Sequence, residues 1–157
     1  MTFAKLLCFA CCASPLFAQG DWPGYGRDAF GQRHSPLTQI NTTNVKRLKP
    51  AWQYGVKPLT PETAPGANGI AATEAVPIMV NGILYAPTLE RTIVALNPET
   101  GQELWKYELG RVGAPLRGVS YWGGDKEHPA SILAGTGDGK LIELNAKTGM
   151  LVPGFGN

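Results

Sequence analysis

The feature that most constrains the fold of this 157-residue chain is a turn sequence that occurs twice. Residues 97–101 (Asn-Pro-Glu-Thr-Gly) and 145–149 (Asn-Ala-Lys-Thr-Gly) share the form Asn-x-x-Thr-Gly, and their glycines lie 48 positions apart. Asn and Thr side chains stabilise tight turns through hydrogen bonds to the backbone, and glycine adopts positive φ readily. A period of roughly 40 to 50 residues with turn signals indicates repeated supersecondary units. The sequence therefore predicts at least two copies of one structural unit.

Short strands are expected on both sides of these turns. Residues 75–80 are apolar, Asn81-Gly82 is a strong signal for a type I′ hairpin turn, and residues 83–86 read as the return strand. Four antiparallel strands joined by tight turns make one blade of a β-propeller, so we predict an all-β propeller with about two blades in this chain. The other predicted strands cover residues 92–96, 103–107, 118–122, 131–134 and 140–144.

The region before the repeats is expected to be irregular. Residues 41–48 predict a short helix whose free amide groups are capped by Thr42 or Thr43. Residues 50–54 read as a strand. Residues 56–73 contain three prolines and two glycines, which favour a loop.

The first 18 residues have the features of an export signal. Lys5 provides a positive charge, residues 6–17 form an apolar stretch too short to span a membrane, and Ala18 is a candidate cleavage site. The sequence therefore predicts a signal peptide over residues 1–18 and a periplasmic protein, with an uncleaved anchor as the alternative. All three cysteines lie inside this segment, so the remaining chain offers no disulfide framework and no thiolate metal site. The net charge of +2 gives no reason to expect nucleic-acid binding.

The first turn belongs to a longer pattern that is typical of a known family. Residues 95–105 follow the form Ala-x-Asn-x-x-Thr-Gly-x-x-x-Trp. This pattern resembles the tryptophan-docking motif of the PQQ-dependent (quinoprotein) alcohol and glucose dehydrogenases. Trp105 is expected to lay a large flat surface against the neighbouring blade. The second repeat has Pro153 at the corresponding position, which resembles the membrane-type glucose dehydrogenases of this family.

The segment before the blades strengthens this resemblance. Residues 21–28 (Asp-Trp-Pro-Gly-Tyr-Gly-Arg-Asp), residues 35–37 and the stretch from Asn44 to Trp52 are similar to the start of these enzymes. The resemblance therefore covers essentially the whole chain after residue 18. It implies a quinoprotein-type eight-bladed propeller that binds pyrroloquinoline quinone (PQQ) and calcium. It also implies oxidation of a sugar, polyol or alcohol, with electrons passing to a respiratory quinone or a cytochrome.

The resemblance also implies that residues 19–157 are an incomplete, N-terminal part of such a propeller. In the family, calcium acts as a Lewis acid on the quinone and an aspartate takes the proton of the alcohol. Those calcium ligands and that aspartate lie further along, and no segment of this sequence matches them. We therefore expect no catalytic and no metal-binding residue in this chain, and no activity unless another polypeptide supplies the missing C-terminal part.

Three residues are candidates for binding the cofactor. Arg117 lies in a segment (Arg-Gly-Val-Ser-Tyr-Trp) that resembles the one whose arginine reaches the quinone oxygens, where a cation stabilises developing negative charge. Glu74 stands where the family has a glutamate lining the quinone pocket, and Thr136 could donate a hydrogen bond to a cofactor carboxylate. Simpler interpretations remain open: Arg117 paired with a surface carboxylate, Glu74 facing solvent at a strand end, and Thr136 stabilising its own turn.

Other features bear on which relatives and which functions are plausible. Many relatives carry adjacent cysteines before the arginine, whereas residues 114–116 here are Ala-Pro-Leu, which favours the glucose dehydrogenase side of the family. His34 and His128 are isolated and read as surface or turn residues. Two alternatives to an enzyme remain: a non-catalytic propeller scaffold of the bacterial envelope, and a non-functional remnant. A scaffold has no need of the Arg117 segment or the opening at residues 21–28.

Overall fold

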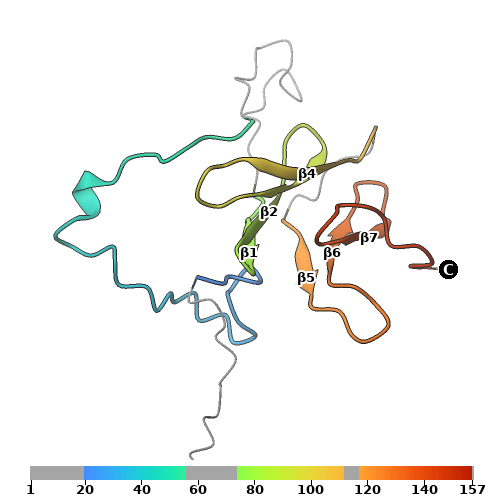
Figure 1. Ribbon diagram of the computed structural model, residues 1–157, viewed down its shortest axis with the longest axis horizontal. Helices are drawn as coiled ribbons and strands as arrows, with labels where there is room; N and C mark the ends of the chain where they lie inside the picture. Colours follow the sequence, from blue (N-terminus) through green and yellow to red (C-terminus); the bar gives the residue numbers. More distant parts are fainter. Residues whose placement is uncertain (1–19, 56–73, 112–116, 157) are drawn as a thin grey trace, which may run out of the picture.

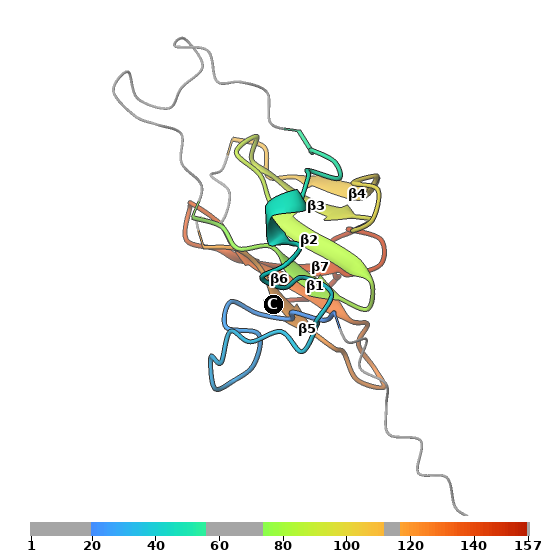
Figure 2. The same ribbon diagram turned by 90° about the vertical axis from the view of Figure 1, so that its left-hand side faces the viewer.

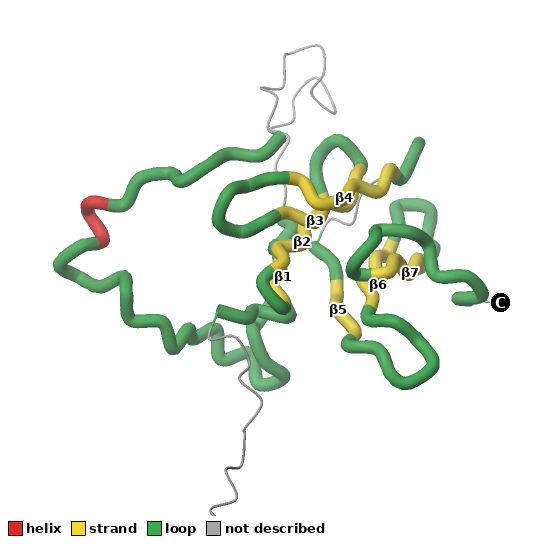
Figure 3. Tube along the Cα trace, viewed as in Figure 1, coloured by secondary structure: helices red, strands yellow, loops and turns green. Residues whose placement is uncertain are grey.

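The computed structural model describes residues 20–55, 74–111 and 117–156, which form two antiparallel sheets joined in chain order (Figure 1). In the first sheet the strand order is β1-β2-β3-β4, and in the second it is β5-β6-β7. The first sheet confirms the predicted four-stranded blade, the second contains the three strands predicted for it, and strands and loops alternate along the trace (Figure 3). The strands are β1 Ile78–Val80, β2 Ile83–Pro87, β3 Thr92–Leu96, β4 Glu103–Glu108, β5 Ser120–Trp122, β6 Ser131–Gly135 and β7 Leu141–Asn145.

Two predictions for the region before the blades are wrong. Residues 50–54 form no strand, because this segment contacts the first sheet through side chains and not through a backbone ladder. The predicted helix is a single 3-10 turn, η1 (Val45–Arg47), whose N-cap Asn44 makes no side-chain capping bond. Neither Thr42 nor Thr43 caps it, and the hydroxyl of Thr43 donates instead to Asn41 at 2.6 Å.

Some predictions fall outside the described residues. These are the signal peptide at 1–18, the loop at 56–73 and the Ala-Pro-Leu segment at 114–116. Among the residues that the structure does describe, no helix is long and apolar enough to cross a membrane.

The hairpin between β1 and β2 turns at Asn81 and Gly82. Their φ angles are 52° and 73°, as a type I′ turn requires, and this prediction is confirmed. On its other edge β1 is bridged by Trp22, whose backbone exchanges hydrogen bonds with Met79 of 2.7 and 3.0 Å. The segment that begins at residue 20 is therefore tied to the first sheet.

The hydrophobic core lies between the two sheets, which pack face to face (Figure 2). Strand alternation directs Ile78 and Ile93 of the first sheet to the same face, and Ile132 and Leu144 of the second sheet meet them. Each of these side chains is at most 1% exposed. Burial of this apolar surface is the main force that holds the sheets together.

Trp105 connects the first sheet to the turn of the second. Its Nε1–H donates to the carbonyl oxygen of Ala146 at 2.9 Å, and the hydroxyl of Tyr85 donates to the same oxygen at 3.2 Å. A Cβ atom on Gly149, whose φ is 70°, would lie 2.6 Å from the Trp105 ring. The predicted docking role of Trp105 is therefore confirmed, and the turn glycine is needed for both its φ and its contact.

The same arrangement occurs at the first turn, where the sequence did not predict it. Trp52 donates its Nε1–H to the carbonyl oxygen of Pro98 at 3.0 Å, and a Cβ atom on Gly101 would lie 2.6 Å from its ring. Next to it, the hydroxyl of Tyr54 donates to the carboxylate of Glu103. The segment at residues 50–54 is thus held against the first sheet by two aromatic side chains.

Raising the pH from about 10 to about 12 is expected to weaken the contact between the sheets through Tyr85. Burial, followed by the nearby Tyr121, raises the pKa of Tyr85 to about 12. Because the folded state holds this proton more tightly than the unfolded state, the stability it provides is complete below about pH 10 and is lost as the pH approaches the folded pKa. A pKa shift of this size corresponds to about 2–3 kcal/mol.

The check is chemical denaturation of the chain and of Tyr85→Phe at several pH values from about 9 to about 12. The phenylalanine variant should start less stable, because it lacks the hydrogen bond to Ala146, and should lose less stability as the pH rises. Tyr25→Phe is the control, because Tyr25 is 64% exposed. Its free energy of unfolding should fall with pH as steeply as that of the parent chain. Equal slopes for Tyr85→Phe and the parent would contradict this assignment.

Candidate functional site

The two sheets meet where their first strands begin. The backbone of Val76, just before β1, forms a parallel bridge with Gly118, just before β5. Gly118 has a φ of 112°, and a Cβ atom there would lie 2.8 Å from the carbonyl oxygen of Val76. Only glycine allows this close approach. The bridge brings the residues that precede it on each chain segment, Glu74 and Arg117, to the same place.

Glu74 and Arg117 form an ion pair at this junction. The Nε atom of Arg117 lies 3.3 Å from Oε2 of Glu74, and the two side chains are 87% and 66% exposed, respectively. Ion pairs with this exposure add little to stability, about 0–1 kcal/mol. The simpler interpretation, in which Arg117 pairs with a surface carboxylate, is compatible with this contact. The structure identifies that carboxylate as Glu74, so two of the three predicted residues lie together.

Thr136 lies at the same end of the second sheet as Arg117 but is not in contact with the pair. The antiparallel register of β5 and β6 brings the end of β6 beside the start of β5. The Thr136 hydroxyl donates to the carboxylate of Asp138 and accepts from the backbone N–H of Lys140 at 3.2 Å. To bind a cofactor carboxylate, it would have to exchange one of these partners. Its cofactor role stays a prediction.

The turn that holds Thr136 has a counterpart in the first sheet. The N–H of Thr136 donates to the carbonyl of Lys140, and the N–H of Thr88 donates to the carbonyl of Thr92, both at 2.8 Å. Thr88 and Thr136 lie 48 positions apart, which is the period of the Asn-x-x-Thr-Gly turns. This shared position shows that the threonine stabilises an equivalent turn in each sheet.

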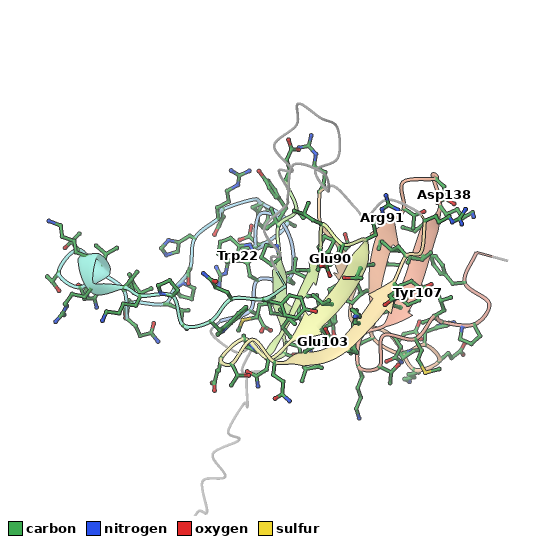
Figure 4. All side chains as sticks on the ribbon, turned by 90° about the horizontal axis from the view of Figure 1, so that it is seen from above. Trp22, Glu90, Arg91, Glu103, Tyr107 and Asp138 are labelled. Atoms are coloured by element: carbon green, nitrogen blue, oxygen red, sulfur yellow. The ribbon has the colours of Figure 1, made fainter. Side chains whose placement is uncertain are left out.

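Two charged side chains that the sequence analysis did not propose as site residues lie on these two turns. Arg91 belongs to the β2–β3 turn and Asp138 to the β6–β7 turn, on the same side of the two sheets (Figure 4). The hydrogen bond from Thr136, followed by that from Lys140, lowers the pKa of Asp138, and Asp138 in turn raises the pKa of Lys140. Arg91 has a φ of 60°, which is uncommon for a residue with a side chain. The turn at residues 136–139 was predicted, and the 48-residue period could have identified the turn of Arg91 from it.

The two histidines match the prediction of surface or turn residues. His128 is exposed in the β5–β6 loop, where its Nδ1 lies 2.9 Å from Oδ1 of Asp125. Backbone hydrogen bonds from Glu127 and His128, and the His128 side chain, lower the pKa of Asp125, with Glu127 contributing most. His34 is exposed. Within residues 20–55, 74–111 and 117–156, no group of three or more His, Cys, Asp or Glu side chains could hold a metal ion.

The chemistry available at the junction is that of an oriented guanidinium. Glu74 contacts the Nε side of Arg117, so the two terminal nitrogens of the guanidinium can donate in another direction. An arginine held in this way suits planar groups that carry negatively charged or carbonyl oxygens. The exposure of both side chains leaves room for such a group.

Comparison with known proteins was made against families, curated sequences and solved structures. Residues 22–157 match the family described as "PQQ: Glucose/ethanol/alcohol dehydrogenase, beta-propeller domain". The chain is 41% identical to the alcohol dehydrogenase (quinone), dehydrogenase subunit, of Gluconobacter oxydans, over 85% of this chain and 16% of that protein. It is 36% identical to the quinoprotein glucose dehydrogenase of Escherichia coli, over 92% of this chain and 20% of that protein.

A solved structure shows the same fold. The crystal structure of quinohemoprotein alcohol dehydrogenase from Comamonas testosteroni superposes with a TM-score of 0.64 at 33% sequence identity, covering 84% of this chain and 18% of that one. The chain thus spans at most about a fifth of the length of these relatives. The family match covers nearly all of the described structure, and its two stacked sheets agree with propeller blades. The chain therefore belongs to the glucose/ethanol/alcohol dehydrogenase β-propeller family of quinoproteins.

Proposed function

We propose that this chain forms two blades of a periplasmic PQQ-dependent dehydrogenase that oxidises an alcohol, a polyol or a sugar. The observation that carries the proposal is the Glu74–Arg117 pair, which the Val76–Gly118 bridge positions where the two sheets meet. The relatives named alcohol dehydrogenase (quinone) and quinoprotein glucose dehydrogenase support the reaction class.

The residues at the junction fit PQQ by their chemistry. When bound, PQQ supplies the ortho-quinone that accepts two electrons from the substrate. Arg117 would donate from its terminal nitrogens to the cofactor's oxygens and stabilise negative charge there. Glu74 would keep the guanidinium oriented through Nε. The described residues offer no acidic cluster for calcium, so we propose no calcium ligand among them.

The remaining parts of this proposal follow from the relatives and from residues 1–18. The electron acceptor would be a respiratory quinone or a cytochrome, and the Ala-Pro-Leu sequence at 114–116 favours a sugar or polyol substrate. The predicted signal peptide supports a periplasmic location. Since the chain spans about a fifth of the length of its relatives, we expect it to need further propeller sequence for activity.

The test is a graft into a complete relative. Residues 22–157 would replace the matched segment of E. coli quinoprotein glucose dehydrogenase, and glucose-dependent dye reduction would be measured with PQQ and calcium. The graft should be active. Within it, Arg117→Lys should lower kcat/KM about ten- to a hundredfold, because the ammonium group of lysine cannot present two parallel N–H donors as a guanidinium does.

Arg47→Lys is the matched control, since Arg47 lies in η1 and is exposed. It should leave kcat/KM unchanged. An active graft in which Arg117→Lys behaves like Arg47→Lys would remove Arg117 from the cofactor site. A folded graft that neither binds PQQ nor oxidises glucose would favour the non-catalytic scaffold.

A further inference from the structure

The two sheets can be compared position by position, because each ends its third strand at an Asn-x-x-Thr-Gly turn. In the first sheet the cross-strand partners Tyr85, Ala95 and Trp105 form one row on the face toward the second sheet. The corresponding row of the second sheet consists of Leu133, Glu143 and Pro153. This row lies on the face away from the first sheet, because the alternate residues of β6 and β7 are in the core.

The two rows have opposite hydrogen-bonding character. In the first sheet, Tyr85 and Trp105 both donate to the carbonyl oxygen of Ala146, in the turn that packs on that face. Neither Leu133 nor Pro153 has a side-chain donor. Glu143 instead offers a carboxylate, which only accepts hydrogen bonds when it is ionised. A turn that packs on this row by presenting a carbonyl oxygen would find no donor.

Glu143 is buried on the outward face of the second sheet. It is 6% exposed, and the hydroxyl of Ser131 donates to its Oε1 at 2.5 Å. In the described part of the chain, no lysine or arginine pairs with it. A buried carboxylate needs a cation or several donors to offset the loss of hydration. One hydroxyl supplies a single donor.

Around the buried Glu143 and Ser131, this face also carries exposed apolar side chains. Trp122 and Leu141, which the register places on the same face as Glu143, are 38% and 57% exposed. The opposite face of the same strands carries Ile132 and Leu144, which are fully buried against the first sheet. The second sheet therefore has one face in an established interface, and its other face carries exposed apolar side chains beside the buried pair of Glu143 and Ser131.

In a propeller of this family a further sheet stacks on this outward face, and we infer that the contacting turn of that sheet brings a basic side chain to Glu143. The inference rests on the family membership of the chain. It assigns an acid–base pairing to this interface, whereas the first interface uses neutral side-chain donors to a carbonyl oxygen. The stacking of the first sheet on the second is the established interface that it continues.

A second copy of this chain does not fit the face. Its turn at residues 97–101 would have to dock there, but the Pro98 carbonyl already accepts from Trp52 of its own chain, and Trp52 covers Gly101. That turn also presents an acidic residue, Glu99, rather than a basic one. The occupant is therefore a sheet of different sequence.

The test compares Glu143→Leu in the full chain and in the graft into E. coli quinoprotein glucose dehydrogenase, with thermal unfolding as the readout. In the chain alone, leucine should raise Tm by about 2–4 °C, because it removes a buried carboxylate that has no cation. In the graft it should lower Tm by at least as much, because it leaves the basic partner buried and unpaired. Glu127→Leu, at an exposed glutamate, is the control and should shift neither Tm.

A fall in Tm of equal size in both backgrounds would overturn the inference, because Glu143 would then serve only its bond to Ser131. An unchanged Tm in the graft would overturn it as well. If the chain alone lacks a cooperative transition, the deciding comparison is between Ser131→Ala and Glu143→Leu in the graft. Ser131→Ala should lower Tm clearly less than Glu143→Leu does, and equal losses of Tm would contradict the inference. None of these readouts depends on enzyme activity, so the proposed function can fail independently.

Discussion

Replacing Trp105 with alanine is expected to destabilise the chain by about 3–5 kcal/mol, the range for removing a large aromatic side chain from a packed site. Trp105 is 9% exposed, contacts Gly149 and shares the Ala146 carbonyl with Tyr85. The substitution would leave a cavity between the two sheets and remove one of the two donors to that carbonyl. Urea denaturation followed by circular dichroism gives the free energy of unfolding.

Trp122→Ala is the matched control for this prediction. Trp122 is 38% exposed on the outward face of the second sheet, where its ring lies 6.0 Å from the ring of His128. Its removal should cost less than about 1.5 kcal/mol. Similar losses for both variants would show that Trp105 does not dock the sheets in the way described.

Gly118→Ala is expected to cost about 2–6 kcal/mol and to disturb the candidate site. The φ of 112° is strained for any residue with a Cβ atom, at about 1–3 kcal/mol. The added methyl group would also lie 2.8 Å from the Val76 carbonyl, and relief of that contact requires backbone movement at about 1–3 kcal/mol. The bridge would open, and the distance between Glu74 and Arg117 would increase.

Two measurements separate these effects of Gly118→Ala. Denaturation of the full chain gives the stability cost, and PQQ affinity of the grafted enzyme reports on the Glu74–Arg117 pair. Gly135→Ala is the control, because its Cβ would meet nothing within 4 Å and its φ is not positive. A stable Gly118→Ala graft with normal PQQ affinity would show that the bridge does not position the site.

The turns and strands after residue 75 were predictable because they depend on local chemistry. Asn81-Gly82 and the two Asn-x-x-Thr-Gly turns need side-chain capping and positive φ, which a few adjacent residues specify. The strand at residues 50–54 was predicted wrongly for the converse reason. An extended segment becomes a strand only when another backbone pairs with it, and here Trp52 and Tyr54 make the contacts instead.

In the candidate site too, the residues were predictable from the sequence, whereas the contacts between them were not. Glu74, Arg117 and Thr136 were named from motifs, and the structure brings the first two into contact and leaves Thr136 engaged in its own turn. The contact between Glu74 and Arg117 depends on the approach of two strand ends that lie more than 40 residues apart. No local sequence pattern specifies a contact between residues that lie so far apart in the chain. Arg91 escaped notice because residues 88–91 lack the two glycines that mark the equivalent turn at residues 136–139, so only the 48-residue period connects the two turns.

By itself, the sequence determined the all-β repeat, because turn chemistry and residue spacing are local properties, and its resemblance to quinoprotein motifs identified the docking role of Trp105 and the family. Only the tertiary structure decided which turn Trp52 covers, where Gly118 lets two strands meet, and that Glu143 is buried on the outward face of the second sheet. These features depend on how one sheet packs against another. Packing joins residues distant in the chain through contacts whose geometry is set by the whole fold.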